Sequence, residues 1–549
     1  MRFARSLCLL AACLLPPLAL AEKQTVCTIT INSADEKQTF RRFLPQDKYD
    51  FVELVERNRP DWLGSACEAK VSCDVLLISG HHGEGNVFFS DALERGEHLP
   101  IAELERVACS DSCPSLFADL KEVYLFGCDT MNPQAQHTVG GEITRSFIRE
   151  GRSSGEASRL TNALRAERGE SSRDRMRLVF KDVPVIYGFS SAAPLGPQAA
   201  VTLRGYFQTA SAREVGNGRT SGGLLRQFAP QGLVAARGMA AGDSLAGLRR
   251  DVCTFANDRL THAQRLESVH QLLQRPVAES RLLLDRIEKF TAELDGSTRR
   301  QPDVAQALER IGRDGESRER YLAFARDADQ PETRARMIVV AHAVGWLSPE
   351  QRREELVQMF SEMLARKAVA GTDVGLACKL SKDGSLNGAL DGLTPVAAQA
   401  QHVGHSAILA CLGDSDARTR ALQGLVSSDD DDVRIAQFYL RHRPISDAYE
   451  LRTITRGIAK MNGSEAQTRA LDVLARHYLS DRESVETLKT LFAKTGAWPV
   501  QNAIAGVLIR ADLKAAGGPD VLQTLREYRL KSLPDGNLVD ALIERLKLS

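Results

Sequence analysis

Short apolar runs without a helical period mark the first part of the chain. Residues 75–78 and 123–126 are continuous apolar stretches, and residues 24–32 alternate Thr, Val and Ile with polar positions. Runs of this length suit strands that are buried on both faces of a parallel sheet. Between them, residues 100–107 carry apolar side chains at helical spacing. The pattern therefore predicts an α/β domain over residues 22–240, with a mostly parallel sheet flanked by helices.

From about residue 240 onward, strand patterns disappear and helical patterns alternate with short polar turns. The segment Thr419-Arg420-Ala421-Leu422 recurs 49 positions later as Thr468-Arg469-Ala470-Leu471. Residues 332–335 and 429–436 resemble the starts of HEAT-type repeat helices. Paired helices at this period predict an all-α, HEAT-like solenoid over residues 241–549. The competing interpretation is an irregular helical bundle.

The first 21 residues have the pattern of a secretory signal peptide. Arg2 and Arg5 form a positive start, an apolar stretch follows, and Ala19-Leu20-Ala21 provides the small residues of a cleavage site. This pattern predicts cleavage after Ala21 and secretion into the periplasm. A second interpretation is a lipoprotein anchored through Cys13, because Leu10-Ala11-Ala12-Cys13 resembles a lipoprotein cleavage box. No later stretch is long and apolar enough for a transmembrane segment.

The charge of the chain bears on its partners. The sequence contains 71 basic and 71 acidic residues. A balanced chain of this kind lacks the electrostatic footprint of a protein that binds nucleic acid. The charge balance therefore predicts no nucleic-acid partner.

Export changes how the cysteines are interpreted. Eleven are present, and without Cys8 and Cys13 of the signal region the mature chain keeps nine, which is an odd number. In an oxidising compartment an odd number leaves one thiol without a disulfide partner. If Cys128 is that thiol, eight cysteines remain for four disulfides. The pairs considered are Cys67/Cys73, Cys109/Cys113, Cys378/Cys411 and Cys27/Cys253, although sequence does not fix the connectivity.

Chemically capable residues follow two of the predicted strands. His81-His82-Gly83 comes after the 75–78 run, and Cys128 comes after the 123–126 run, 46 positions beyond His82. Because sites in open α/β sheets form beyond the carboxyl ends of the strands, we expect His82 and Cys128 to lie together. A cysteine becomes a nucleophile when a neighbouring base takes its proton, and histidine does this near neutral pH. Gly83 and the backbone of Cys128 would supply the N–H groups of an oxyanion hole.

These two stretches resemble the caspase-like cysteine peptidases of clan CD, most closely the bacterial CHAT-like branch. The resemblance rests on a hydrophobic strand that ends in His-Gly and a second that ends in Cys, and it covers residues 24–240. It implies that Cys128 is the nucleophile and His82 the general acid and base. The chain lacks the Gln-Ala-Cys of caspases, and Met131 after Thr130 departs from the Cys-x-Thr-Gly of CHAT members. This departure leaves the substrate preference open.

Alternatives exist for the two histidines. His81 competes with His82 as the base, but it should point the other way on an extended strand, where it would pack or form hydrogen bonds. The two histidines could also bind a metal, with His137 as the one nearby ligand candidate. Since no cluster has metal-ligand spacing, we predict neither metal nor cofactor.

The sequence says less about the substrate. Asp129 and Asp91 are candidates for a pocket that accepts Arg or Lys, and the alternative for each is a surface or capping carboxylate. The Arg-rich residues 149–177 are interpreted as an exposed, mobile loop or a loop that flanks a helix, either a solvated insertion or a place where the chain is cut during activation.

Two functional hypotheses follow. The first is an exported thiol protease, an endopeptidase with a Cys128–His82 dyad whose helical domain recruits a substrate or a protein partner. The second is an inactive caspase-like and HEAT-repeat scaffold that mediates protein–protein interactions in the cell envelope. A free, readily alkylated Cys128 would favour the enzyme.

Overall fold

The structure is a computed structural model of the full chain with two compact units, which divide after Ile311. It describes residues 23–55, 63–83, 87–90, 98–134, 140–149, 151–167, 171–209, 215–382, 384, 386, 393, 402–445, 447–512, 518–534 and 536–547. The predicted signal peptide and the alternative lipid anchor at Cys13 lie outside the described residues.

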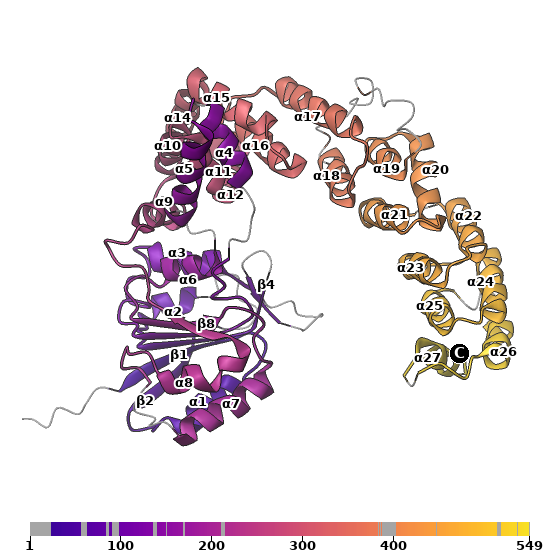
Figure 1. Cartoon of the computed structure of the whole chain (residues 1–549), viewed down its shortest axis with the longest axis horizontal. Coiled ribbons are helices and arrows are strands. Elements are labelled where there is room, and N and C mark those ends of the chain that lie inside the picture. The colour runs from indigo at the N-terminus through magenta and orange to yellow at the C-terminus, as the bar shows by residue number, and fades with distance from the viewer. Residues whose placement is uncertain are drawn as a thin grey trace, which may run out of the picture. The chain divides into compact units, whose positions relative to one another are not determined.

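A six-stranded sheet forms the centre of the first unit (Figure 1). Its strands, in spatial order, are β2 (Tyr49–Glu53), β1 (Gln24–Thr30), β3 (Val75–Ser79), β7 (Glu122–Phe126), β8 (Val185–Phe189) and β9 (Leu233–Ala236). Every pair is parallel except β8 with β9. The predicted mostly parallel sheet is therefore confirmed, and β9 is an antiparallel edge strand that the sequence pattern missed.

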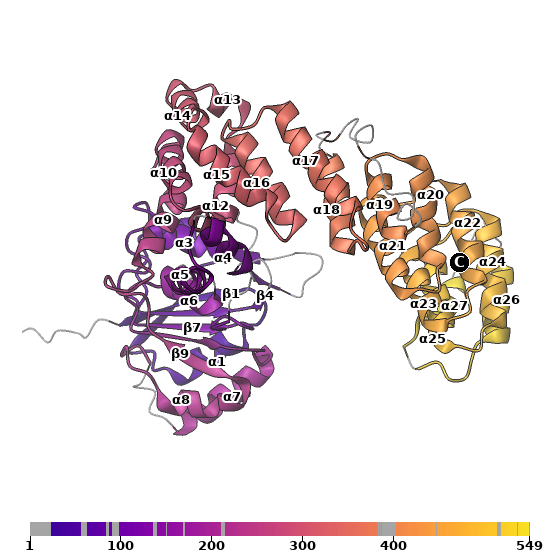
Figure 2. The ribbon, with the colours of Figure 1, turned by 45° about the horizontal axis from the view of Figure 1, so that its top comes forward.

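Helices cover both faces of this sheet (Figures 1 and 2). The helices of one face are α1 (Asp35–Phe43), α7 (Gly196–Thr209) and α8 (Gly222–Gln227), and those of the other face are α2 (Gly64–Glu68), α3 (Ile101–Cys109) and α6 (Ser172–Val179). Successive side chains of a strand point to opposite faces. Thus Val75 and Leu77 join the core under α1 and α7, whereas Leu76 and Ile78 join the core under α3 and α6. Burial on both faces explains why β3 reads as a continuous apolar run.

A small antiparallel sheet follows β3 directly. It contains β4 (His81–Gly83), β5 (Val87–Phe89) and β6 (His98–Pro100). His82 of β4 lies opposite Phe88 of β5. The β4–β5 hairpin thus leads the chain away from the edge of the main sheet, and His82, the predicted base, lies in its first strand.

The Arg-rich segment differs from the prediction. The described part of residues 149–177 is mostly helical, because α5 (Ser154–Glu167) and the start of α6 occupy it. The helix α4 (Gly140–Arg149) packs with α5, and Phe147, Ala157 and Leu164 share a small core with Ala278. The buried positions Ala157, Thr161 and Leu164 have helical spacing, but the polar residues around them obscure it. The interpretation as an exposed loop is therefore wrong for these residues, whereas the alternative of a loop that flanks a helix fits residues 151–153 before α5.

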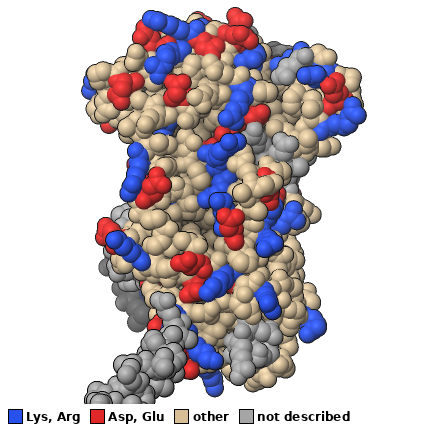
Figure 3. Space-filling view, turned by 90° about the vertical axis from the view of Figure 1, so that its left-hand side faces the viewer, with Lys and Arg blue, Asp and Glu red and all other residues tan. Residues whose placement is uncertain are grey.

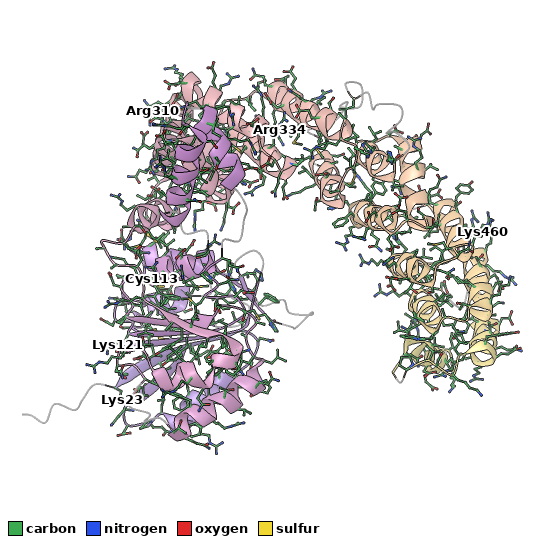
Figure 4. All side chains as sticks on the ribbon, in the orientation of Figure 1. Lys23, Cys113, Lys121, Arg310, Arg334 and Lys460 are labelled. Carbon is green, nitrogen blue, oxygen red and sulfur yellow. A yellow bond between two sulfur atoms is a disulfide. The ribbon has the colours of Figure 1, made fainter. Side chains whose placement is uncertain are left out.

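Four disulfides are formed, and Cys128 is the one cysteine without a disulfide among the described residues. The bridges are Cys27–Cys73, Cys67–Cys113, Cys109–Cys253 and Cys378–Cys411. Cys378–Cys411 is confirmed, whereas the other three predicted pairings are wrong. The actual bridges in the first unit join segments that are far apart in sequence, and Cys113 lies beside the helices above the sheet (Figure 4). Such bridges suit an oxidising compartment.

Every described element beyond Ala236 is a helix. In the first unit they are α9 (Ala246–Ala256), α10 (His262–Gln274), α11 (Val277–Leu282), α12 (Leu284–Glu293), α13 (Gly296–Arg299) and α14 (Pro302–Gly312), the last of which reaches the border. These helices are tied to the sheet region. Arg249 donates to the Ala108 and Leu178 carbonyls at 2.8 and 2.7 Å, and Arg286 forms a bidentate pair with the buried Glu105 at 2.5 and 2.6 Å. Beyond the predicted border at residue 240 the described elements are all helices, but the compact unit continues to Ile311.

The second unit is an array of paired helices. They are α15 (Gly315–Arg326), α16 (Pro331–Ala343), α17 (Pro349–Leu364), α18 (Gly371–Lys382), α19 (Val403–Cys411), α20 (Ser415–Gln423), α21 (Asp430–His442), α22 (Ala448–Ala459), α23 (Ser464–Leu474), α24 (Arg482–Lys494), α25 (Trp498–Leu508), α26 (Gly518–Tyr528) and α27 (Leu538–Lys547). The helices α21, α23, α25 and α27 contact one another in sequence, and α22, α24 and α26 form a second row (Figure 1). Ala421 of α20 and Ala470 of α23, from the recurring segment, are both fully buried.

The apolar character of the helices and the surface charge bear on the surroundings of the protein. No described helix combines the length and the apolar character that crossing a membrane requires. On the face drawn in Figure 3, acidic and basic side chains are interspersed.

Candidate active site

Neighbouring strands bring the two predicted residues to one edge of the sheet. β3 and β7 are adjacent and parallel, with Ser79 opposite Phe126, so both chains leave the sheet at the same edge. The Gly80 N–H donates to the Phe126 carbonyl at 3.1 Å and continues the pairing to the start of the hairpin. His82 and Cys128 therefore meet, as the order of the strands requires.

Gly127 allows the close approach of the two segments. A Cβ atom on Gly127 would lie 2.9 Å from the Gly80 carbonyl oxygen, 2.9 Å from the His82 Cβ and 3.0 Å from the Phe88 ring. Atoms at these distances overlap, so only glycine lets the His82 backbone lie against the residue that precedes Cys128. The sequence showed glycine at this position, but the need for it arises from a contact across the sheet edge.

The ring of His82 is buried, with 4% of the residue exposed, and forms a hydrogen bond to the backbone of Cys128. Its Nδ1 lies 2.9 Å from the Cys128 carbonyl oxygen, and the ring packs on Phe88 with 4.9 Å between centroids. Because a carbonyl oxygen only accepts hydrogen bonds, this contact assigns a proton to Nδ1. His82 Nε2 is buried and has no hydrogen-bond partner among the described residues.

Burial sets the charge state of this ring. Removal from water lowers the pKa of His82 below its usual 6.5, while the hydrogen bond to the Cys128 carbonyl and the negative charge of Asp129 act in the opposite direction. Arg175, which lies on α6, adds to the lowering through its positive charge. The favoured form near neutral pH is thus the neutral ring, with its free lone pair on Nε2.

The thiol of Cys128 is partly exposed and makes a different contact. Its Sγ accepts a hydrogen bond from the Ala193 N–H at 3.3 Å. Neither nitrogen of His82 is bonded to Sγ, since Nδ1 bonds the Cys128 carbonyl and Nε2 has no partner in the described part of the chain. The two residues are therefore together, but the proton path from sulfur to imidazole is not closed in this state. Catalytic hydrogen bonds are often absent before substrate binds.

A tight turn presents Cys128 to this edge. Asp129 has φ = 54°, the left-handed region that costs most residues about 1–3 kcal/mol and that Asp tolerates better. The turn is held by the strand next to it: the Asp129 N–H donates to the Ser191 carbonyl and the Met131 N–H to the Phe189 carbonyl, both at 2.9 Å. Thr130 Oγ1 accepts from the Phe189 N–H at 3.1 Å. The conformation at Asp129 is thus fixed by contacts on both sides.

The other predicted residues have these positions. The Nε2 atom of His81 lies 3.0 Å from the side-chain amide nitrogen of Asn32, and the ring packs on Phe89. His81 thus makes the hydrogen-bonding and packing contacts that the sequence suggested as its alternative role. Gly83 ends β4 opposite Val87. The Asp129 carboxylate accepts from the Asn132 amide at 3.0 Å, a turn contact that occupies one of its oxygens. Asp91 and His137 lie outside the described residues.

The described residues of the site do not form a set of metal ligands. Within the described ranges, no three His, Cys, Asp or Glu side chains gather in a way that would hold a metal ion. The arrangement instead offers a thiol, a neutral imidazole with an unoccupied lone pair, and backbone N–H groups, which are the groups that acyl transfer needs.

Comparisons with known proteins add nothing to this geometry. No family model, no curated protein and no solved structure matches the chain.

Proposed function

We propose that the protein is an exported cysteine endopeptidase in which Cys128 is the nucleophile and His82 the general base and acid. One observation carries the proposal: the one cysteine without a disulfide among the described residues lies at a strand end against a buried, neutral histidine. A cysteine at a strand end is more often structural, and Cys128 alone would not indicate chemistry. Its combination with a desolvated imidazole lone pair argues for chemistry.

The reaction begins with proton transfer from the thiol to His82 Nε2. The transfer uses a rotation of either side chain, or one bridging water, because the two atoms are not bonded in the resting state. The hydrogen bond from Nδ1–H to the Cys128 carbonyl orients the ring and stabilises the imidazolium that forms. This support comes from the backbone of the nucleophile itself.

The thiolate then attacks the carbonyl carbon of the scissile peptide bond. An S–C bond forms, the carbonyl electrons move to oxygen, and the C–N bond breaks as Nε2–H gives its proton to the leaving amine. Water, deprotonated by the same nitrogen, next attacks the thioester, and the sulfur leaves with the proton restored to it. The cycle consumes one water and needs no cofactor.

Backbone N–H groups serve the oxyanion. No hydrogen bond of the Cys128 N–H is found within the described residues, so this donor is available to a carbonyl bound at Sγ. Gly83 follows the base and has no side chain to block its own N–H. Donors that are already oriented stabilise the developing charge without reorganisation.

We also propose the domain types, the location and the partner of the helical domain. The dyad at the carboxyl edge of a parallel sheet supports a caspase-like peptidase domain, and the two rows of helices support a HEAT-like solenoid that recruits a substrate or partner. Four disulfides support a periplasmic location. Cleavage after Arg or Lys stays a prediction, because Asp129 is engaged by Asn132 and Asp91 is outside the described residues.

The test compares mature wild-type protein with the variants Cys128→Ala, His82→Ala and His81→Ala on a mixture of peptides that contains every residue type. Products are identified by mass spectrometry. We expect cleavage by the wild type and the His81 variant, and none by the other two. A folded wild type that cuts nothing, or a Cys128→Ala variant that cuts equally well, would instead support the scaffold hypothesis.

A further inference from the structure

The sulfur of Cys128 has one hydrogen-bond partner among the described residues, and it is not the histidine. The donor is the backbone N–H of Ala193, 3.3 Å away, in the segment that follows β8. Ala193 belongs to an irregular stretch of residues 192–195, between the end of β8 and the start of α7. A residue with a methyl side chain gives no sequence signal of this kind, because the contribution comes from its main chain.

The amide of Ala193 is held in place by several contacts. The preceding residues bond across to the turn of the nucleophile, through the Ser191 and Phe189 carbonyls described above. On the other side, the Ser190 N–H donates to the Gly232 carbonyl at 3.1 Å. Pro194 follows Ala193 and restricts its backbone to extended conformations. The N–H therefore points at Sγ as part of a fixed frame.

We propose that the Ala193 N–H is a catalytic group that stabilises the thiolate of Cys128. An N–H donor bonds an anion about twice as strongly as a neutral acceptor, so it favours the ionised sulfur over the thiol. This role is needed because burial disfavours the imidazolium form of His82, which would otherwise hold the thiolate as an ion pair. The assignment of a catalytic role rests on the proposed function, whereas the effect on the thiol itself does not.

The size of the effect follows from two opposing terms. Loss of a charge-assisted hydrogen bond reduces the fraction of thiolate about tenfold, at a pH where most molecules carry the thiol. The less stabilised thiolate is a better nucleophile, with a Brønsted coefficient of about 0.4–0.5, which returns a factor of roughly 3. The net expectation is a rate of thiol reaction lowered by about 3- to 4-fold.

The experiment measures the reaction of Cys128 with a dipyridyl disulfide in the mature, disulfide-bonded protein. The thiolate attacks one sulfur of the reagent, forms a mixed disulfide and releases pyridinethiolate, which is read by its absorbance. Ala193→Pro removes the N–H but places a ring carbon where the hydrogen pointed at Sγ, and Ala192→Pro controls for a ring in this segment while it keeps the Ala193 donor. Replacement of Ala193 by lactic acid exchanges the N–H for an ester oxygen without adding a ring, so it separates loss of the donor from crowding of the sulfur.

We expect the 193 variants to react 3- to 4-fold more slowly and to show a lower kcat with an unchanged KM, and the 192 variant to match the wild type. Equal rates for the wild type and the 193 variants would overturn the proposal, as would equal slowing in the 192 control. If the wild type cleaves no peptide but the 193 variants still react more slowly, the peptidase function fails while the contact between this amide and the thiolate stands.

Discussion

Gly127 offers the sharpest test of how the site is assembled. The variant Gly127→Ala places a methyl carbon 2.9 Å from the Gly80 carbonyl oxygen and 2.9 Å from the His82 Cβ. Ordinary contacts of this kind begin at 3.4 Å, so each neighbour must retreat by about 0.5 Å. Gly80 is fixed by its bond to the Phe126 carbonyl at 3.1 Å, and the hairpin that carries His82 is the part that moves.

Two consequences of different kinds follow. Overpacking of this extent destabilises a protein by about 1–3 kcal/mol, which lowers the melting temperature without unfolding the protein at 25 °C. The displacement of His82 from Cys128 lowers the rate, because a misplacement of about 1 Å at a catalytic group costs on the order of 100-fold in rate. A retreat of about 0.5 Å is half that distance, so we expect kcat/KM to fall by about 10-fold in a folded protein.

The assay pairs peptide cleavage with thermal unfolding of the same samples. The control is Gly205→Ala on α7, where the added methyl meets nothing closer than 3.7 Å and replaces a helical glycine. This variant should keep full activity and gain about 0.5–1 kcal/mol of stability. A fully active Gly127→Ala protein would refute the argument that His82 must lie against this strand end.

Three further predictions concern the charge state of His82 and the borders of the sheet unit. Burial lowers the pKa of His82 below 6.5, so the folded protein binds fewer protons than the unfolded chain as the pH falls through 6.5. Wild type should therefore lose stability on acidification across this window and His82→Gln should lose less, as followed by urea unfolding at pH 5 to 7.5. Equal slopes of the unfolding free energy against pH for the two proteins would contradict this prediction. Removal of the Cys109–Cys253 bridge, whose cysteines lie 144 positions apart, by a double serine change should cost about 2–5 kcal/mol in unfolding of the first unit, whereas loss of Cys378–Cys411 should leave peptidase activity unchanged. A chain that ends at residue 240 leaves Glu105 without Arg286, a loss of about 3–5 kcal/mol in the free energy of unfolding. Circular dichroism should show this fragment unfolded or weakly folded, while a chain that ends at Ile311 should stay folded. A stable 22–240 fragment would show that helices α9 to α14 are dispensable for folding.

The sequence predicted the local features and one long-range feature. Continuous apolar runs identified β3 and β7 because both faces of these strands are buried, and the order of parallel strands then placed His82 beside Cys128. The helix at residues 100–107 was also predicted, since α3 presents one apolar face to the sheet. Such predictions depend on the periodicity of a single segment.

Features that depend on contacts between segments were not predictable. Cys73 lies two residues before the start of β3 and forms its disulfide with Cys27 on the neighbouring β1, so proximity in sequence to Cys67 was misleading. The pair Cys378–Cys411 was predictable because α18 and α19 follow each other along the chain. Ala193 and Gly127 contribute a main-chain donor and an empty space, and neither is visible in the type of residue alone.

The central claim is that Cys128 attacks peptide carbonyls with His82 as its base, and trapping of the acyl-enzyme tests it most directly. Wild type and His82→Ala are mixed with a cleavable peptide, quenched in acid within the first turnover, and searched by mass spectrometry for a thioester. The account predicts an acyl group on Cys128 of the wild type, formed at least about 100-fold more slowly without His82. An acyl group on another residue, or equal rates with and without His82, would contradict it.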